Sequence, residues 1–149
     1  MKISIVGTEE RGIRTMAKYD LHFQGYYSQP EELPENAGIY CVFKSSKKEN
    51  ALSLVYIGQS DDIRRRLKEH ESENAFLATE GELLVYSYAL VKNKAARLRI
   101  EAALIAHFKP SANTQNISGH KYDSASFKLT GAVGILAGDD KTKELHFVE

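Results

Sequence analysis

Two tyrosines, Tyr40 and Tyr56, carry the first sign of chemistry in this sequence. Tyr40 ends the triplet Gly-Ile-Tyr, and Tyr56 begins the triplet Tyr-Ile-Gly. A tyrosine hydroxyl donates or accepts a hydrogen bond, and it accepts a proton from water if its pKa is lowered. Two strand tyrosines that pack in a core would give the same pattern, so the pair alone does not decide between the two interpretations.

A basic cluster follows the second tyrosine and consists of Arg64, Arg65, Arg66, Lys68 and His70. Arg66 and His70 are four positions apart, so on a helix they share a face. An arginine held on that face could bind a phosphate through its planar fork. A solvated basic face is the alternative, and we expect that role for Arg64 or Arg65.

Glu101 is the candidate carboxylate. It lies within or beside the apolar stripe expected on a helix over residues 94–108, formed by Leu98, Ala102, Ile105 and Phe108. A buried carboxylate tends to bind a proton unless a cation or an arginine accompanies it. After this helix come Pro110 and Asn113, and Asn113 is either a site residue or an ordinary turn residue.

The elements that must position these residues can be read from apolar patterning and turn residues. Strands are expected over residues 2–6, 20–27, 38–43, 51–57, 82–91, 127–137 and 144–148, with a turn over 138–141. Two of them form a hairpin that brings the tyrosines together across the sheet. A helix capped by Ser60 runs to about residue 71, and Asn93 caps the helix over 94–108. The fold class is therefore α+β.

Composition sets the cellular context. The single cysteine, Cys41, excludes an internal disulfide and favours the reducing cytoplasm, and no apolar stretch is long enough for a signal peptide or a membrane span. The net charge of zero argues mildly against a nucleic-acid-binding protein. However, residues 38–121 hold 13 Lys and Arg against 9 Asp and Glu, so the basic excess lies where the candidate chemistry lies.

Taken in order, these features resemble the GIY-YIG nuclease superfamily over residues 36–116. The shared elements are the two triplets, Arg66 ten positions after Tyr56, Glu101 on a later helix, and then Pro110 and Asn113. The resemblance implies a small three-stranded antiparallel sheet flanked by helices. Residues 1–35 would be an N-terminal extension with an extra strand, and residues 117–149 a C-terminal β extension packed on the core.

The resemblance also implies a set of site residues. Its catalytic members would be Tyr40, Tyr56, Arg66, His70 and Glu101, and substrate binding or structural support would fall to Gly38, Gly58, Gln59, Arg65 and Asn113. Glu101 would hold one divalent cation, Mg²⁺ or Mn²⁺, with Tyr40 as the general base. Gln59 departs from the family pattern, because some repair-type members have a lysine there.

The expected activity is endonucleolytic hydrolysis of phosphodiester bonds in nucleic acid, with DNA favoured over RNA. The alternative is a non-catalytic nucleic-acid-binding or regulatory subunit on the same fold. A protein partner or a homodimer could form through the terminal extensions. Further phosphate contacts could come from a second basic group, although a solvated helix face explains it equally well: Lys92, Lys94, Arg97 and Arg99.

Overall fold

The computed structural model describes residues 2–7, 15–49, 51–114, 125–132 and 142–147. The described elements are β1 (Lys2–Gly7), β2 (Thr15–Tyr27), the 3₁₀ turn η2 (Pro30–Glu32), β3 (Gly38–Ser46), β4 (Ala51–Ser60), α1 (Ile63–Ser72), β5 (Glu82–Leu90), α2 (Lys94–Phe108), β6 (Ala125–Gly131) and β7 (Thr142–Phe147). The expected α+β class is confirmed, and the expected turn over residues 138–141 lies outside the described residues.

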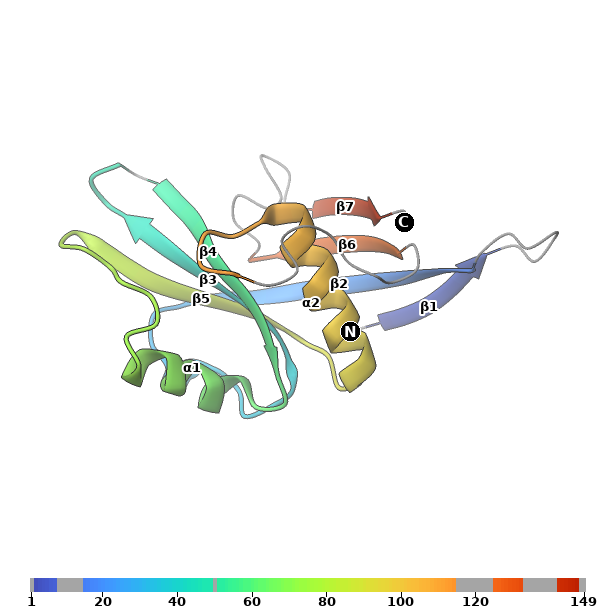
Figure 1. Cartoon of the computed structure of the whole chain (residues 1–149), viewed down its shortest axis with the longest axis horizontal. Helices are drawn as coiled ribbons and strands as arrows, with labels where there is room; N and C mark the ends of the chain where they lie inside the picture. Colours follow the sequence, from blue (N-terminus) through green and yellow to red (C-terminus); the bar gives the residue numbers. More distant parts are fainter. Residues whose placement is uncertain (1, 8–14, 50, 115–124, 133–141, 148–149) are drawn as a thin grey trace.

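Three antiparallel strands, β4, β3 and β5, form the part of the sheet that carries the two triplets. This part matches the expected three-stranded antiparallel unit, but the sheet does not end there, because the expected extra strands at both ends of the chain join it. β2 pairs with β5 and extends the sheet to β6 and β7, with β1 also on β2, so the described residues build seven strands in one sheet (Figure 1). The cause is the length of β2, which is 13 residues and reaches beyond the end of β5.

The two helices cover different parts of this sheet. One core contains β3 and β5 residues such as Ile39 and Ala89, together with Ile100 and Leu104 of α2. A second core contains Tyr40 and Val42 on the alternate strand positions, together with Leu67 of α1. Because successive side chains of a strand point to opposite faces, α1 and α2 pack against opposite faces of β3.

Local sequence explains where both helices begin. The Asp62 side chain accepts a hydrogen bond from Arg65 N at 3.0 Å and caps α1. The prediction that Ser60 would be the cap was therefore wrong, because the Ser60 hydroxyl instead bonds the backbone of Asp62. Asn93 caps α2, as expected, by accepting from Ala96 N at 2.8 Å.

The expected buried stripe of α2 is confirmed in part, because Ala102 and Ile105 are buried as predicted. Leu98 is 37% exposed, whereas Ala96, Ile100 and Leu104 are buried. The helix is apolar around most of its circumference, so periodicity could not identify which stripe faces the sheet. No helix among the described residues is long and apolar enough to cross a bilayer.

Candidate active site

The two tyrosines lie together on the α1 side of the sheet. Tyr40 on β3 pairs with Gly58 on β4, and Tyr56 pairs with Val42, so the two rings are diagonal neighbours across the hairpin. Their ring centroids are 6.1 Å apart, and the ring planes are inclined by 27°. Tyr40 is fully buried, whereas Tyr56 is half-buried, so only Tyr56 presents part of its ring to solvent.

His70 joins this pair from the last turn of α1. Its Nε2 lies 2.9 Å from the Tyr40 hydroxyl in a buried hydrogen bond. Burial lowers the pKa of His70, and the positive charge of Arg66 lowers it further, so the ring is neutral at pH 7. The other ring nitrogen, Nδ1, is buried and has no hydrogen-bond partner among the described residues.

Phe76 completes an aromatic enclosure that the sequence analysis missed. Its ring centroid is 5.0 Å from that of His70 and 5.2 Å from that of Tyr56. It is a half-buried phenylalanine in a polar stretch between α1 and β5, and this isolation was the one available signal. Phe76 thus covers the side of His70 and Tyr56 that Tyr40 leaves open.

Arg66 lies on the same face of α1 as His70. It is half-buried, and its Nη1 is 3.4 Å from Glu69. Burial is the main cause that raises the pKa of Tyr40 well above its ordinary value, and the Arg66 charge acts in the opposite direction. The same charge acts on Tyr56, whose pKa is also raised mainly by burial. The guanidinium therefore faces the space shared by the two phenols.

Glu101 reaches this space from α2. The negative charge of its carboxylate contributes to raising the pKa of both Tyr40 and Tyr56. Burial raises the pKa of Glu101 from 4.5 to about 7, and a hydrogen bond with the Gln59 backbone opposes that shift. Glu101 forms no ion pair with any described residue. A half-buried carboxylate with no ion-pair partner among the described residues thus lies close enough to both phenols to act on them.

The outer edge of β4 explains how a residue of α2 reaches the opposite face of the sheet. Residues in and after α2 bond to this edge in place of a further strand: Ala112 N donates to Val55 O at 2.9 Å. The Asn113 side chain accepts from Ile57 N at 3.0 Å and donates to Ile57 O at 2.9 Å. These contacts hold the end of α2 along the edge of β4 that carries Tyr56.

The two glycines of the triplets permit close approaches. A Cβ at Gly58 would overlap with the ring and hydroxyl of Tyr40, and a Cβ at Gly38 would overlap with Ala89 O. Gly58 therefore provides the room in which the Tyr40 hydroxyl lies. Gly38 allows β3 and β5 to stay in register where the first triplet begins.

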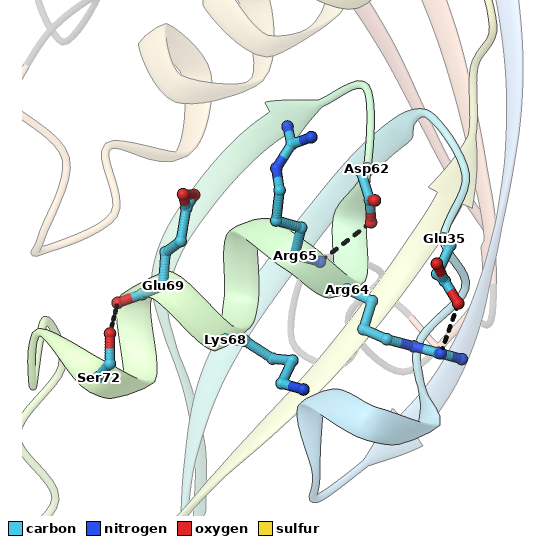
Figure 2. Close-up of a pocket in the computed structure, with 7 residues that line it drawn as sticks. All are labelled: Glu35, Asp62, Arg64, Arg65, Lys68, Glu69 and Ser72. Atoms are coloured by element: carbon cyan, nitrogen blue, oxygen red, sulfur yellow. Dashed lines mark hydrogen bonds and ion pairs between the residues drawn. The ribbon is translucent and has the colours of Figure 1, made fainter.

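The remaining arginines of α1 lie along a separate hollow of about 620 Å³, lined by Glu35, Asp62, Arg64, Arg65, Lys68, Glu69 and Ser72 (Figure 2). Arg64 forms an ion pair with Glu35 at 2.8 Å and donates a hydrogen bond to Leu33 O at 2.7 Å. These two contacts connect α1 to the segment that follows η2. Arg65 is exposed and bonds Asp61 at 2.6 Å. Neither guanidinium joins the tyrosines.

The basic residues on and just before α2 lie in three different environments. Lys92 and Lys94 are exposed, as a solvated helix face predicts. Arg99 is half-buried and lies 3.4 Å from the hydroxyl of Tyr19. Arg97 is only 5% exposed, so the solvated-face interpretation is wrong for this residue.

The site offers a hard cation one carboxylate, so the protein alone would bind the cation weakly. A carboxylate oxygen is the kind of ligand that Mg²⁺ and Mn²⁺ bind, and Glu101 lacks the cationic partner that its burial calls for. Within the described ranges no three His, Cys, Asp or Glu side chains come together. Glu101 would therefore be the main protein ligand, with the remaining ligands from water and a bound phosphate.

The hairpin carries two tyrosines, an arginine lies on the following helix and a carboxylate on the next one, which is the arrangement that the resemblance to the GIY-YIG family implied. The family model described as the GIY-YIG catalytic domain matches residues 36–116, and the chain belongs to this family. The match covers β3 through the Asn113 turn and leaves out β1, β2, β6 and β7.

One curated relative is the UvrABC system protein C of Thermosipho africanus (strain TCF52B). It is 32% identical over 92 residues, which make up 59% of this chain. The match spans 15% of the length of that relative. No solved structure matches the chain.

Proposed function

We propose that this chain is a metal-dependent endonuclease that hydrolyses phosphodiester bonds in DNA. The observation that carries the proposal is that the charges of Arg66 and Glu101 both act on the two tyrosines, although the four residues come from four different elements. Hydrolysis needs a proton acceptor for the attacking water, a positive group for the charge that develops on phosphorus, and neutralisation of the leaving oxygen.

Tyr40 and His70 form the proton acceptor. Burial raises the pKa of Tyr40, so a free phenolate is not available at neutral pH. When the ring proton of His70 is on Nδ1, Nε2 accepts the Tyr40 proton across the 2.9 Å bond, while the phenol oxygen takes the proton of the attacking water. The water becomes the nucleophilic hydroxide and His70 becomes the imidazolium, so the transfer balances.

Arg66 stabilises the additional negative charge of the phosphorane-like transition state, and Tyr56 orients the water or a phosphate oxygen. When bound to Glu101, Mg²⁺ or Mn²⁺ would supply further positive charge to the phosphate and to the leaving oxygen. Because burial raises the Glu101 pKa to about 7, the carboxylate becomes a better ligand as the pH rises through neutrality.

The test compares the wild-type chain with Glu101→Gln on plasmid, single-stranded DNA, branched DNA and RNA, with and without Mg²⁺ or Mn²⁺. We expect cation-dependent cleavage by the wild type and a loss of about 10²-fold or more in the variant. Cleavage by Glu101→Gln near the wild-type rate would overturn the assignment. Binding without cleavage by the wild type would instead indicate the non-catalytic alternative.

The substrate and the partners are part of the same proposal. We expect DNA rather than RNA as the substrate. We also predict that a protein partner or a second copy of the chain binds through residues 1–35 and 117–149. The four nucleic acids in the cleavage test identify the substrate class directly. Sedimentation of the purified chain, alone and with DNA, measures whether a dimer forms.

A further inference from the structure

A second hollow, of about 350 Å³, lies beside the candidate active site at the start of α2. It is lined by Gln59, Ser60, Asp61, Lys94 and Arg97. Gln59 belongs to both places, because its backbone lies close enough to the Glu101 carboxylate to lower the Glu101 pKa while the residue also lines the hollow. Arg97 and Glu101 are four residues apart on α2, which separates them by about 6 Å along the helix axis.

The Arg97 guanidinium is held rigidly. Its Nε donates to the Gln59 side chain at 3.0 Å, and Nη1 donates to Lys92 O at 2.7 Å and to Val91 O at 3.3 Å. These partners are all uncharged oxygens, so within the described part of the chain no carboxylate bonds this buried cation, although its charge acts on the exposed Asp61 and helps to lower the Asp61 pKa. Burying an uncompensated charge is costly, which makes an anionic ligand the natural complement.

One edge of this guanidinium remains available. Nη2 of Arg97 has no hydrogen-bond partner among the described residues, and it is not among the fully buried unpaired atoms. Its two N–H groups therefore face solvent where Arg97 lines the hollow. Three bonds fix the guanidinium, so little conformational entropy would be lost when an anion binds.

The charge of the hollow also favours an anion. Lys94 is exposed and forms no ion pair with a described residue. Asp61 is the one acid in the lining, and Arg65 bonds it at 2.6 Å. At pH 7, Lys94, Arg97 and Arg65 therefore outweigh Asp61.

We propose that Arg97 and Lys94 form a phosphate subsite, which holds the DNA strand at a phosphate next to the one that is cut. This inference rests on the proposed nuclease function for its choice of ligand. A site about 6 Å along α2 from Glu101 is within reach of a phosphate one or two nucleotides from the phosphate that is cut.

The test measures binding in the absence of divalent cations, so that no cleavage is needed. The probe is a short fluorescent single-stranded DNA in which one phosphate at a time is replaced by a neutral methylphosphonate, at low salt. For the wild type we expect one position at which the replacement weakens binding by about tenfold. In Lys94→Gln, overall binding should be weaker and the penalty at that position should shrink.

Two further variants sharpen the test. Lys92→Gln is the matched control, because Lys92 is exposed near the same helix end but does not line the hollow, and its profile should match the wild type. Arg97→Lys keeps the charge but loses the fork, and should also reduce the penalty at the same phosphate. Because Arg97 is buried, circular dichroism and urea unfolding check that the Arg97→Lys variant is folded. The Lys94→Gln variant changes an exposed residue and so tests the proposal independently.

The outcomes separate this proposal from the nuclease proposal. The key comparison is how much a neutral linkage at each position weakens binding. If this dependence on position is the same in Lys94→Gln as in the wild type, the subsite proposal is overturned, even if the chain cleaves DNA. Failure of the wild type to bind any of these strands would overturn it as well. A chain that shows the expected profile but never cleaves would keep the subsite and overturn the nuclease activity.

Discussion

The Tyr40 hydroxyl and Nε2 of His70 are 2.9 Å apart in a buried hydrogen bond. The bond joins the first triplet on β3 to the end of α1, across 30 positions of sequence. Since burial raises the pKa of the phenol and lowers that of the imidazole, both groups are neutral at pH 7. The pair is therefore suited to pass a proton rather than to hold a charge.

Tyr40→Phe should abolish this transfer. We expect the cleavage rate to fall about 10²-fold or more, because general base catalysis contributes that much. Stability should fall by about 1–3 kcal/mol, because the variant leaves His70 Nε2 buried without a partner. Plasmid cleavage and urea unfolding measure the two effects. Tyr86→Phe is the control in the same core, and equal losses in both variants would contradict the assignment.

Arg66→Lys should lower the cleavage rate about 10²-fold while leaving affinity for DNA nearly unchanged. A lysine keeps the charge, but it cannot present the planar fork that bonds two phosphate oxygens. Single-turnover cleavage and binding without cation separate the two quantities. Lys68→Gln, an exposed neighbour on α1, serves as the control. A normal rate for Arg66→Lys would show that only charge is needed.

Glu101→Gln should change how stability depends on pH. Since the folded pKa is raised from 4.5 to about 7, the folded chain keeps a proton that the unfolded chain loses in this window. Glu101 therefore lowers the free energy of unfolding as the pH rises through this window, by about 3 kcal/mol at most. The variant lacks this cost.

Urea unfolding of Glu101→Gln and wild type should therefore give a difference in unfolding free energy that grows in favour of the variant between about pH 4 and pH 8. Using a difference between two chains removes the opposite contribution of His70, whose pKa is lowered. The exposed Glu80→Gln should show no such trend. A difference that stays constant with pH would mean that the carboxylate is well solvated. Mg²⁺ should reduce the difference if Glu101 binds it.

Asn113→Ala should destabilise the chain by about 2–4 kcal/mol, because two buried backbone groups of Ile57 lose their partners. Cleavage should fall as well, since the β4 edge then no longer holds α2 beside Tyr56. Ser111→Ala, an exposed change in the same turn, should stay within about 0.5 kcal/mol of the wild type. Equal unfolding midpoints for the two variants would contradict the bracing role.

Sequence patterns predicted the local elements well. The bounds of α2 agree with the expected helix over 94–108, and the two triplets lie on neighbouring strands as expected. These features depend on turn residues, caps and alternation, which are local. That Glu101 of one helix and Arg66 of the other would both act on the tyrosines was expected only through the resemblance to a family.

Long-range contacts were the part that patterning could not supply. Leu98 and Arg97 are adjacent on an apolar helix, and only packing decides that the arginine is the buried one. Likewise, the continuation of the sheet depends on β2 pairing with β6, more than 100 positions later. Phe76 offered no periodic signal because it lies outside every helix and strand.

The length of β2 has a consequence for how the chain unfolds. Its end, residues 24–27, pairs with β5, and residues 15–23 pair with β1 and β6. Breaking β2 would therefore leave the edge of β5 open and separate β6 and β7 from the other strands at the same moment. Residues 36–116 and the terminal strands should consequently unfold in one cooperative transition. A fragment of residues 36–116 alone should be less stable than the whole chain.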